Sequence, residues 1–186
     1  MQTLMQSFER RIKTKKSQRG KTMKNRKLYK ILKNKFDYVD GDLIYKDGRR
    51  TGMAAGTIST SHGYRNLSVD GKVYLVHRMI YLYCHGYLPP VIDHIDTDKL
   101  NNRIENLRPA TQEQNAYNAK LSKANSSGIK GVSWHKATQK WQVVLKVKKK
   151  HIWLGCYADI KDAEAAVKEH REQLHGEFTN HGDKAA

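Results

Sequence analysis

The sequence has little cysteine and no long apolar run. Only Cys84 and Cys156 are present in 186 residues, far apart and in no C-x-x-C pair. This leaves little material for a cysteine zinc site and indicates reduced thiols in a cytosol-like compartment. No run of about 18 apolar residues occurs, so we expect no membrane span. The first 30 residues also lack the apolar core of a signal peptide.

Acidic residues are scarce as well. The chain has 18 Asp and Glu against 35 Lys and Arg, a net charge of +17 and a pI near 9.9. Such an excess points to nucleic acid or an anionic membrane surface as a partner. The hydrophobic fraction of 38% predicts thin cores.

The positive charge is concentrated in two segments. Residues 1–35 hold 13 Lys and Arg and one acid, Glu9, and residues 120–150 hold nine lysines and no acid. The first segment is either a disordered solubilising tail or an arm that contacts DNA. We therefore expect five parts: a basic arm (1–35), a central domain (36–119), a linker (120–128), a C-terminal domain (129–180) and a tail (181–186).

Local patterns predict short elements in the central domain. Alternating runs at 64–69 and 72–76, joined by Asp70-Gly71, predict a hairpin. A helix is expected next, from apolar residues at helical spacing, with its end near His85-Gly86. The T-x-x-Q form of Thr111-Gln112-Glu113-Gln114 predicts the capped start of another helix. In the arm, Leu28, Ile31 and Leu32 share one side of a short helix.

The most informative feature is the pair Asp93-His94, with an asparagine, Asn115, placed 21 residues after the histidine. A carboxylate and an amide supply the oxygen ligands that suit a hard divalent cation such as Mg²⁺. A histidine beside such a cation can activate water. With the net positive charge, hydrolysis of a nucleic-acid phosphodiester is the function to test first.

The spacing predicts a ββα unit around these residues. A strand ends at Asp93-His94, a polar loop follows, and a short return at 106–108 leads into the helix that begins near Thr111. Adjacent side chains of a strand face opposite sides, so Asp93 would bind the metal while His94 holds the water. Asn118 lies one helical turn after Asn115, so either amide could face the site.

These residues resemble the HNH homing endonucleases, in the subgroup common in bacteriophages and introns. The resemblance covers roughly residues 36–119. It rests on five motifs in order: V-H-R at 76–78, G-Y-L-P-P at 86–90, I-D-H-I-D at 92–96, N-N-R-I-E-N-L-R at 101–108 and Q-N-A-Y-N at 114–118.

The resemblance implies a ββα-metal fold with one divalent ion, Mg²⁺ or alternatively Mn²⁺. It implies that Asp93 and Asn115 are metal ligands and that His94 is the general base. Asn106 corresponds to the central asparagine of the family, which braces the loop between the strands. The family also implies a double-stranded DNA substrate and a location in the host bacterial cytoplasm.

The C-terminal domain is expected to hold three strands and a helix. The strands are predicted at 130–134, 141–148 and 151–157, and the helix opens at Asp159-Ile160. Four side chains are expected on one face of this helix: Ile160, Ala163, Val167 and Leu174.

Residues 129–180 resemble the AP2 DNA-binding domain, a three-stranded antiparallel sheet packed on a helix. The motifs are G-I-K-G-V at 128–132, H-I-W-L-G-C-Y at 151–157, D-A-E-A-A at 162–166 and H-G-E-F at 175–178, with Trp141. In that family the sheet enters the major groove. The positions that contact DNA correspond here to Lys130, Lys146, His151 and Trp153.

The fold class expected for the whole chain is therefore α+β. The expected function is site-specific, metal-dependent DNA cleavage by a homing-type enzyme that needs no membrane and no small-molecule substrate. Two alternatives remain: an AP2-type regulator with an inactive HNH scaffold, and an RNA-binding or structural nucleic-acid protein, which charge alone would allow. The sequence leaves the oligomeric state open.

Overall fold

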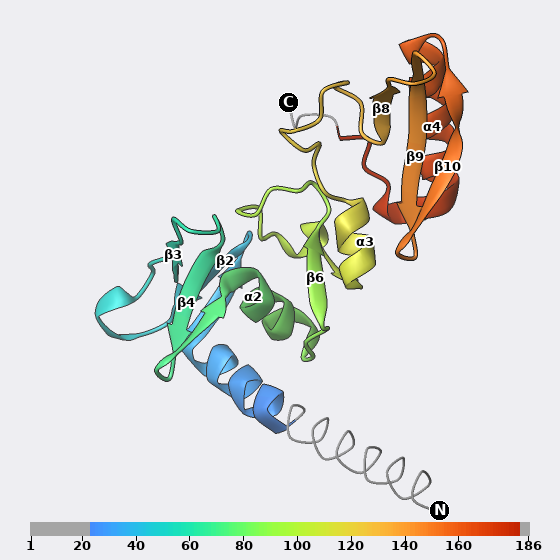
Figure 1. Cartoon of the computed structure of the whole chain (residues 1–186). Helices are drawn as coiled ribbons and strands as arrows, with labels where there is room; N and C mark the ends of the chain where they lie inside the picture. Colours follow the sequence, from blue (N-terminus) through green and yellow to red (C-terminus); the bar gives the residue numbers. More distant parts are fainter. Residues whose placement is uncertain (1–22, 183–186) are drawn as a thin grey trace, which may run out of the picture. The chain divides into compact units, whose positions relative to one another are not determined.

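A computed structural model describes residues 23–182 of the chain (Figure 1). It has small antiparallel sheets and helices, as expected for the α+β class. Contacts divide the chain into two compact units, one with residues up to Pro89 and Lys99–Leu107, the other with Pro90–Asp98 and residues from Arg108 onward. In this grouping the strand with Asp93 falls with the C-terminal residues, and the expected boundaries at 36–119 and 129–180 stay a prediction.

The first unit begins, within the described residues, with a helix over residues 23–35. Leu28 is 6% exposed and Leu32 is fully buried, so the expected apolar side of this helix is confirmed and packs into the unit. The expectation for the rest of the arm falls on residues 1–22, outside the described part. Strands β1 (Phe36–Val39) and β2 (Asp42–Tyr45) follow as an antiparallel hairpin.

A three-stranded sheet and a helix complete the first unit. The hairpin expected around Asp70-Gly71 is confirmed, and both turn residues have positive φ, 48° and 73°. The expected helix is also confirmed, and it ends at Gly86, with φ 74°. The elements are η1 (Gly48–Arg50), β3 (Thr57–Ile58), β4 (Arg65–Val69), β5 (Lys72–Leu75) and α2 (Val76–His85), with the strands in the order β3-β4-β5.

The predicted ββα unit is present. Its strands pair with each other in a two-stranded sheet, and the helix begins one residue after Ala110, at the cap Thr111. The elements are β6 (Val91–His94), η2 (Ile104–Asn106), β7 (Leu107–Ala110) and α3 (Gln112–Tyr117).

The C-terminal residues form the expected sheet and helix. The strand order is β10-β9-β8, and α4 lies against the sheet (Figure 1). The elements are β8 (Val132–His135), β9 (Lys140–Val147), β10 (Lys150–Tyr157), α4 (Ile160–His175) and η3 (Gly176–Phe178). The core between them consists of Val132, Val143, Leu145, Ala163 and Val167.

The buried face of α4 differs from the expected one at its C-terminal end. Leu174 is 39% exposed, whereas Arg171 has no exposed surface. Ala163 and Val167 start a row spaced four residues apart, and Arg171 continues that row. The Arg171 guanidinium bonds to the Lys130 carbonyl oxygen and, at 2.9 Å, to Nδ1 of His181. These bonds allow a charged side chain to occupy a core position.

No helix within residues 23–182 is both long enough and apolar enough to cross a membrane.

The close approach at Gly56 predicts a measurable stability difference between two glycines. Gly56 has φ 94°, and a Cβ there would lie 2.8 Å from both the Asn66 oxygen and Cγ2 of Val76; Gly71 has φ 73° and open space around it. We expect Gly71→Ala to cost about 1–2 kcal/mol for the left-handed backbone. Gly56→Ala should cost about 1–3 kcal/mol more because of overpacking. Urea unfolding of both variants measures this, and equal midpoints would contradict it.

Candidate active site

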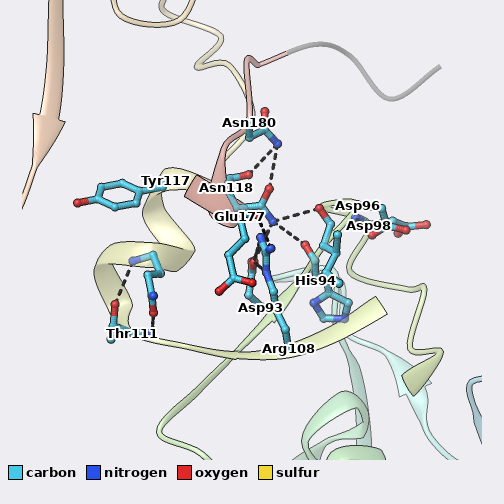
Figure 2. A network of polar contacts seen from close by, with 12 residues as sticks. Asp93, His94, Asp96, Asp98, Arg108, Thr111, Tyr117, Asn118, Glu177 and Asn180 are labelled. Carbon is cyan, nitrogen blue, oxygen red and sulfur yellow. Dashed lines mark hydrogen bonds and ion pairs between the residues drawn. The ribbon is translucent and has the colours of Figure 1, made fainter. Parts of the chain in front are cut away.

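Asp93 and His94 lie side by side at the end of β6. Pro89-Pro90 precedes this strand and forces extended chain into it. Both side chains are buried, with 4% of Asp93 and 5% of His94 exposed. Figure 2 shows them leaving the strand in different directions, as expected for neighbours on a strand. The two groups can therefore take different partners.

The Asp93 carboxylate is held by two residues, Arg108 and Asn118. Nε of Arg108 donates to Oδ2 at 2.9 Å, and a second guanidinium nitrogen lies 2.9 Å from the same oxygen. Nδ2 of Asn118 lies 3.1 Å from Oδ1 and 3.0 Å from Oδ2. A buried carboxylate requires such partners. The sequence interpretation assigned no role to Arg108, although this residue lies in the N-L-R motif.

Asn118 binds the peptide backbone as well as Asp93. Its Nδ2 donates to the His94 carbonyl oxygen at 2.7 Å and lies 3.3 Å from the Ile95 carbonyl oxygen. Its Oδ1 accepts a hydrogen bond from Nδ2 of Asn180 at 3.1 Å. Since the amide nitrogen faces four oxygens, the orientation of this amide is determined. Asn118 therefore acts as a brace that fixes the strand end.

Asn115, the expected second metal ligand, lies in the middle of α3 and is exposed. The helix that carries it has the expected capping box, with Thr111 Oγ1 and Gln114 Oε1 each accepting a backbone hydrogen bond from the other residue, at 3.1 and 2.8 Å. Of the two amides that the sequence left open, Asn118 is the one on Asp93. The role of Asn115 in metal binding stays a prediction.

Asn106, the expected loop brace, belongs to the first unit. Its Nδ2 donates to the Asn101 carbonyl oxygen at 2.8 Å, so it spans the loop that precedes β7. This is the hydrogen bonding expected of a brace, and a catalytic contribution stays a prediction.

The donors around Asp93 are compatible with a hard cation. Three of the four contacts to the carboxylate involve Oδ2, and Oδ1 takes only the Asn118 contact. A carboxylate oxygen accepts two partners, so Oδ1 retains capacity for a metal. Within residues 23–182 no cluster of three or more His, Cys, Asp or Glu could hold an ion. Among the described residues, Asp93 and His94 would therefore need further ligands, such as water or substrate oxygens, to complete the coordination of an ion.

Three of the four expected DNA-contacting residues share one face of the C-terminal sheet. His151 is paired directly with Lys146 in the β9–β10 register, and Trp153 lies two residues further along β10 and is therefore on the same side. Lys146 and His151 are exposed, and Trp153 is 65% exposed. This face is free of the α4 core.

Lys130, the fourth expected contact, is held inside the second unit. Its Nζ donates to the carbonyl oxygens of Tyr117, Ala119 and Asn180 at 2.7, 2.6 and 3.1 Å. Burial, and secondarily the charge of Arg171, lowers the pKa of Lys130 to about 8. The amine is still mostly protonated at pH 7 and satisfies three carbonyls. This geometry favours a structural role for Lys130 over a DNA contact.

Comparison with known proteins indicates the family of this chain. A family model described as HNH endonuclease matches residues 74–117, which include β6, β7 and α3. Protein 3.8 of Escherichia phage T7 is 34% identical over 105 residues, 55% of this chain and 85% of the T7 protein. An HNH endonuclease of Acanthamoeba polyphaga mimivirus is 46% identical over 66 residues, which is 34% of this chain and 34% of that protein. No solved structure matches. The chain therefore belongs to the HNH endonuclease family, whose members hydrolyse phosphodiester bonds.

Proposed function

We propose that this protein is a metal-dependent, site-specific DNA endonuclease of the homing type, with His94 as general base and with Asp93 and Asn115 as metal ligands. The observation that supports it most is the buried Asp93-His94 pair at the end of β6 in a ββα unit. The net charge of +17 supports a polyanionic substrate.

His94 would remove the proton from the attacking water. The imidazole is the side chain whose ordinary pKa lies closest to neutral pH, which suits a general base. Arg108 and Asn118 hold the neighbouring Asp93 carboxylate in a fixed direction. A bound Mg²⁺ would supply positive charge to the phosphate oxygens as negative charge develops there.

The C-terminal sheet would bind DNA through the face that carries Lys146, His151 and Trp153. A small antiparallel sheet can enter the major groove, and this one presents an ammonium group, an imidazole and an indole ring on one face. This is the AP2-like reader that the sequence motifs suggest. Ser133 and Val144 stand where plant members carry arginine, so a GC-rich target does not follow.

Loss of the His94 imidazole should abolish most cleavage. A positioned general base contributes about 10²–10⁴-fold to the rate, so His94→Ala should lower plasmid cleavage in Mg²⁺ by that factor and leave DNA affinity unchanged. His170→Ala is the control, because His170 lies on α4 and bonds to the Ala166 carbonyl oxygen. Full-rate cleavage by His94→Ala would refute the role.

The two asparagines of the α3 segment should respond differently to Mg²⁺. EDTA should abolish cleavage. Asn115→Ala should raise the half-saturating Mg²⁺ concentration, with thermal stability unchanged because the side chain is exposed. Asn118→Ala should lower the melting temperature, since it leaves the buried Asp93 short of a donor. A Mg²⁺ titration and thermal melts of both variants test this. An unchanged Mg²⁺ requirement in Asn115→Ala would exclude Asn115 as a ligand.

The two lysines near the sheet should separate DNA binding from folding. Lys146→Ala should weaken DNA binding. It should also reduce the slope of log K against the logarithm of the salt concentration by the amount that corresponds to about one phosphate contact. Lys130→Ala should instead lower the melting temperature, because three carbonyl oxygens lose their donor. Fluorescence anisotropy at several salt concentrations, together with thermal melts, distinguishes them. Equal salt slopes for wild type and Lys146→Ala would contradict the proposed binding face.

A further inference from the structure

The C-terminal segment after α4 reaches the candidate active site. Nδ2 of Asn180 donates to the backbone oxygen of Asn118 at 3.0 Å and to its Oδ1 at 3.1 Å. Nδ2 of Asn118, at the other end of the Asn118 side-chain amide, donates to the Asp93 carboxylate. Figure 2 shows Asn180, Asn118 and Asp93 joined by these bonds in one chain.

Arg108, the other partner of Asp93, is attached to the same segment. Its guanidinium donates to the Glu177 carbonyl oxygen at 2.6 Å and lies over the ring of Phe178, 3.8 Å from the centroid. Phe178 is 3% exposed, so this cation–π contact is largely shielded from water. Both groups that hold the Asp93 carboxylate are therefore themselves held by residues 177–180.

Helix α3 has further attachments to the C-terminal elements. The Tyr117 ring stacks on His175 with centroids 3.8 Å apart and planes 1° apart. The backbone amides of Lys148 and Lys149, in the β9–β10 turn, donate to the Tyr117 hydroxyl at 3.1 Å and to Glu113 Oε1 at 3.0 Å. These contacts attach α3, which Asn118 caps, to α4 and to the β9–β10 turn.

We propose that Glu177, Phe178 and Asn180 are built-in parts of the nuclease centre, with Asn180 as a positioning residue that orients the Asn118 amide toward Asp93. The Asn180 NH₂ group presents a donor to Asn118 Oδ1, so the Asn118 NH₂ group is turned toward the carboxylate and the His94 carbonyl. Asn180 acts through Asn118 and is not a catalytic residue. This inference rests on the proposed role of Asp93 and His94.

The test compares Asn180→Ala and Asn180→Asp with Thr179→Val in the full-length chain. Asn180→Asp keeps the acceptor for the Gly182 amide but places an oxygen against the two Asn118 oxygens. Thr179→Val is the matched control, because Oγ1 of Thr179 bonds to the Arg171 carbonyl oxygen instead of Asn118. Loss of a residue that orients a ligand typically costs about 10–100-fold. Both Asn180 variants should lose kcat by that factor and need more Mg²⁺, with the KM for DNA unchanged; Thr179→Val should keep both.

A second measurement does not depend on cleavage. In ¹⁵N-labelled protein, the side-chain amide of Asn118, identified by its loss in Asn118→Ala, should exchange slowly with solvent in wild type and rapidly in Asn180→Ala. Retained protection in Asn180→Ala, or equal loss of kcat in Thr179→Val, would overturn the proposal. If the wild-type chain cleaves no DNA in Mg²⁺ or Mn²⁺, the proposed function fails, and the exchange rates alone decide whether Asn180 holds Asn118.

Discussion

The ion pair between Asp93 and Arg108 is the interaction on which the candidate site depends. A carboxylate with 4% of its surface exposed needs protein partners in place of the water that it has lost. Arg108 supplies the opposite charge and Asn118 supplies a neutral donor. Charge and hydrogen bonding at the end of β6 are therefore both provided by protein groups. Asp93 is thus held in one orientation by protein contacts, and such preorganisation reduces the reorganisation that a charged group needs when it acts on a substrate.

The elements of the fold follow from local signals, and for that reason they could be predicted from the sequence. The Asp70-Gly71 turn, the capping box at Thr111 and the apolar row of α4 each involve residues within a few positions of one another. Turn type and cap chemistry depend on those residues alone. The error at the end of α4 has the same origin, since a burial pattern based on apolarity assigns Leu174 to the core and rejects Arg171. In the structure Leu174 is exposed and Arg171 is buried, because the Arg171 guanidinium bonds to acceptors in residues distant in the sequence.

The supporting groups of the candidate site could not be predicted in this way. Asp93 and His94 stand out because adjacent acid and imidazole groups have an obvious chemistry. Asn118 and Asn180 are 62 residues apart, and nothing in the composition around Asn180 marks it as a partner of the nuclease residues. Lys130 shows the reverse case. Its position in the motif suggests a DNA contact, yet three backbone carbonyls take all the hydrogens of its ammonium group.

The direction of the hydrogen bonds explains why asparagine occurs at both 118 and 180. An amide has a donor end and an acceptor end, so two amides in series transmit one orientation along the chain of bonds. Asn180 donates to Asn118, and Asn118 donates to Asp93. A carboxylate at either position would supply only acceptors, and an alkyl side chain would supply neither a donor nor an acceptor. Oδ1 of Asn180 also accepts a hydrogen bond from the Gly182 amide, and the Asn180 backbone carbonyl accepts one from Lys130. These two bonds fix the Asn180 side chain, and with it the direction of the hydrogen bonds that lead to Asp93. Within the second unit these bonds join β6, α3 and the segment that follows α4 in one network.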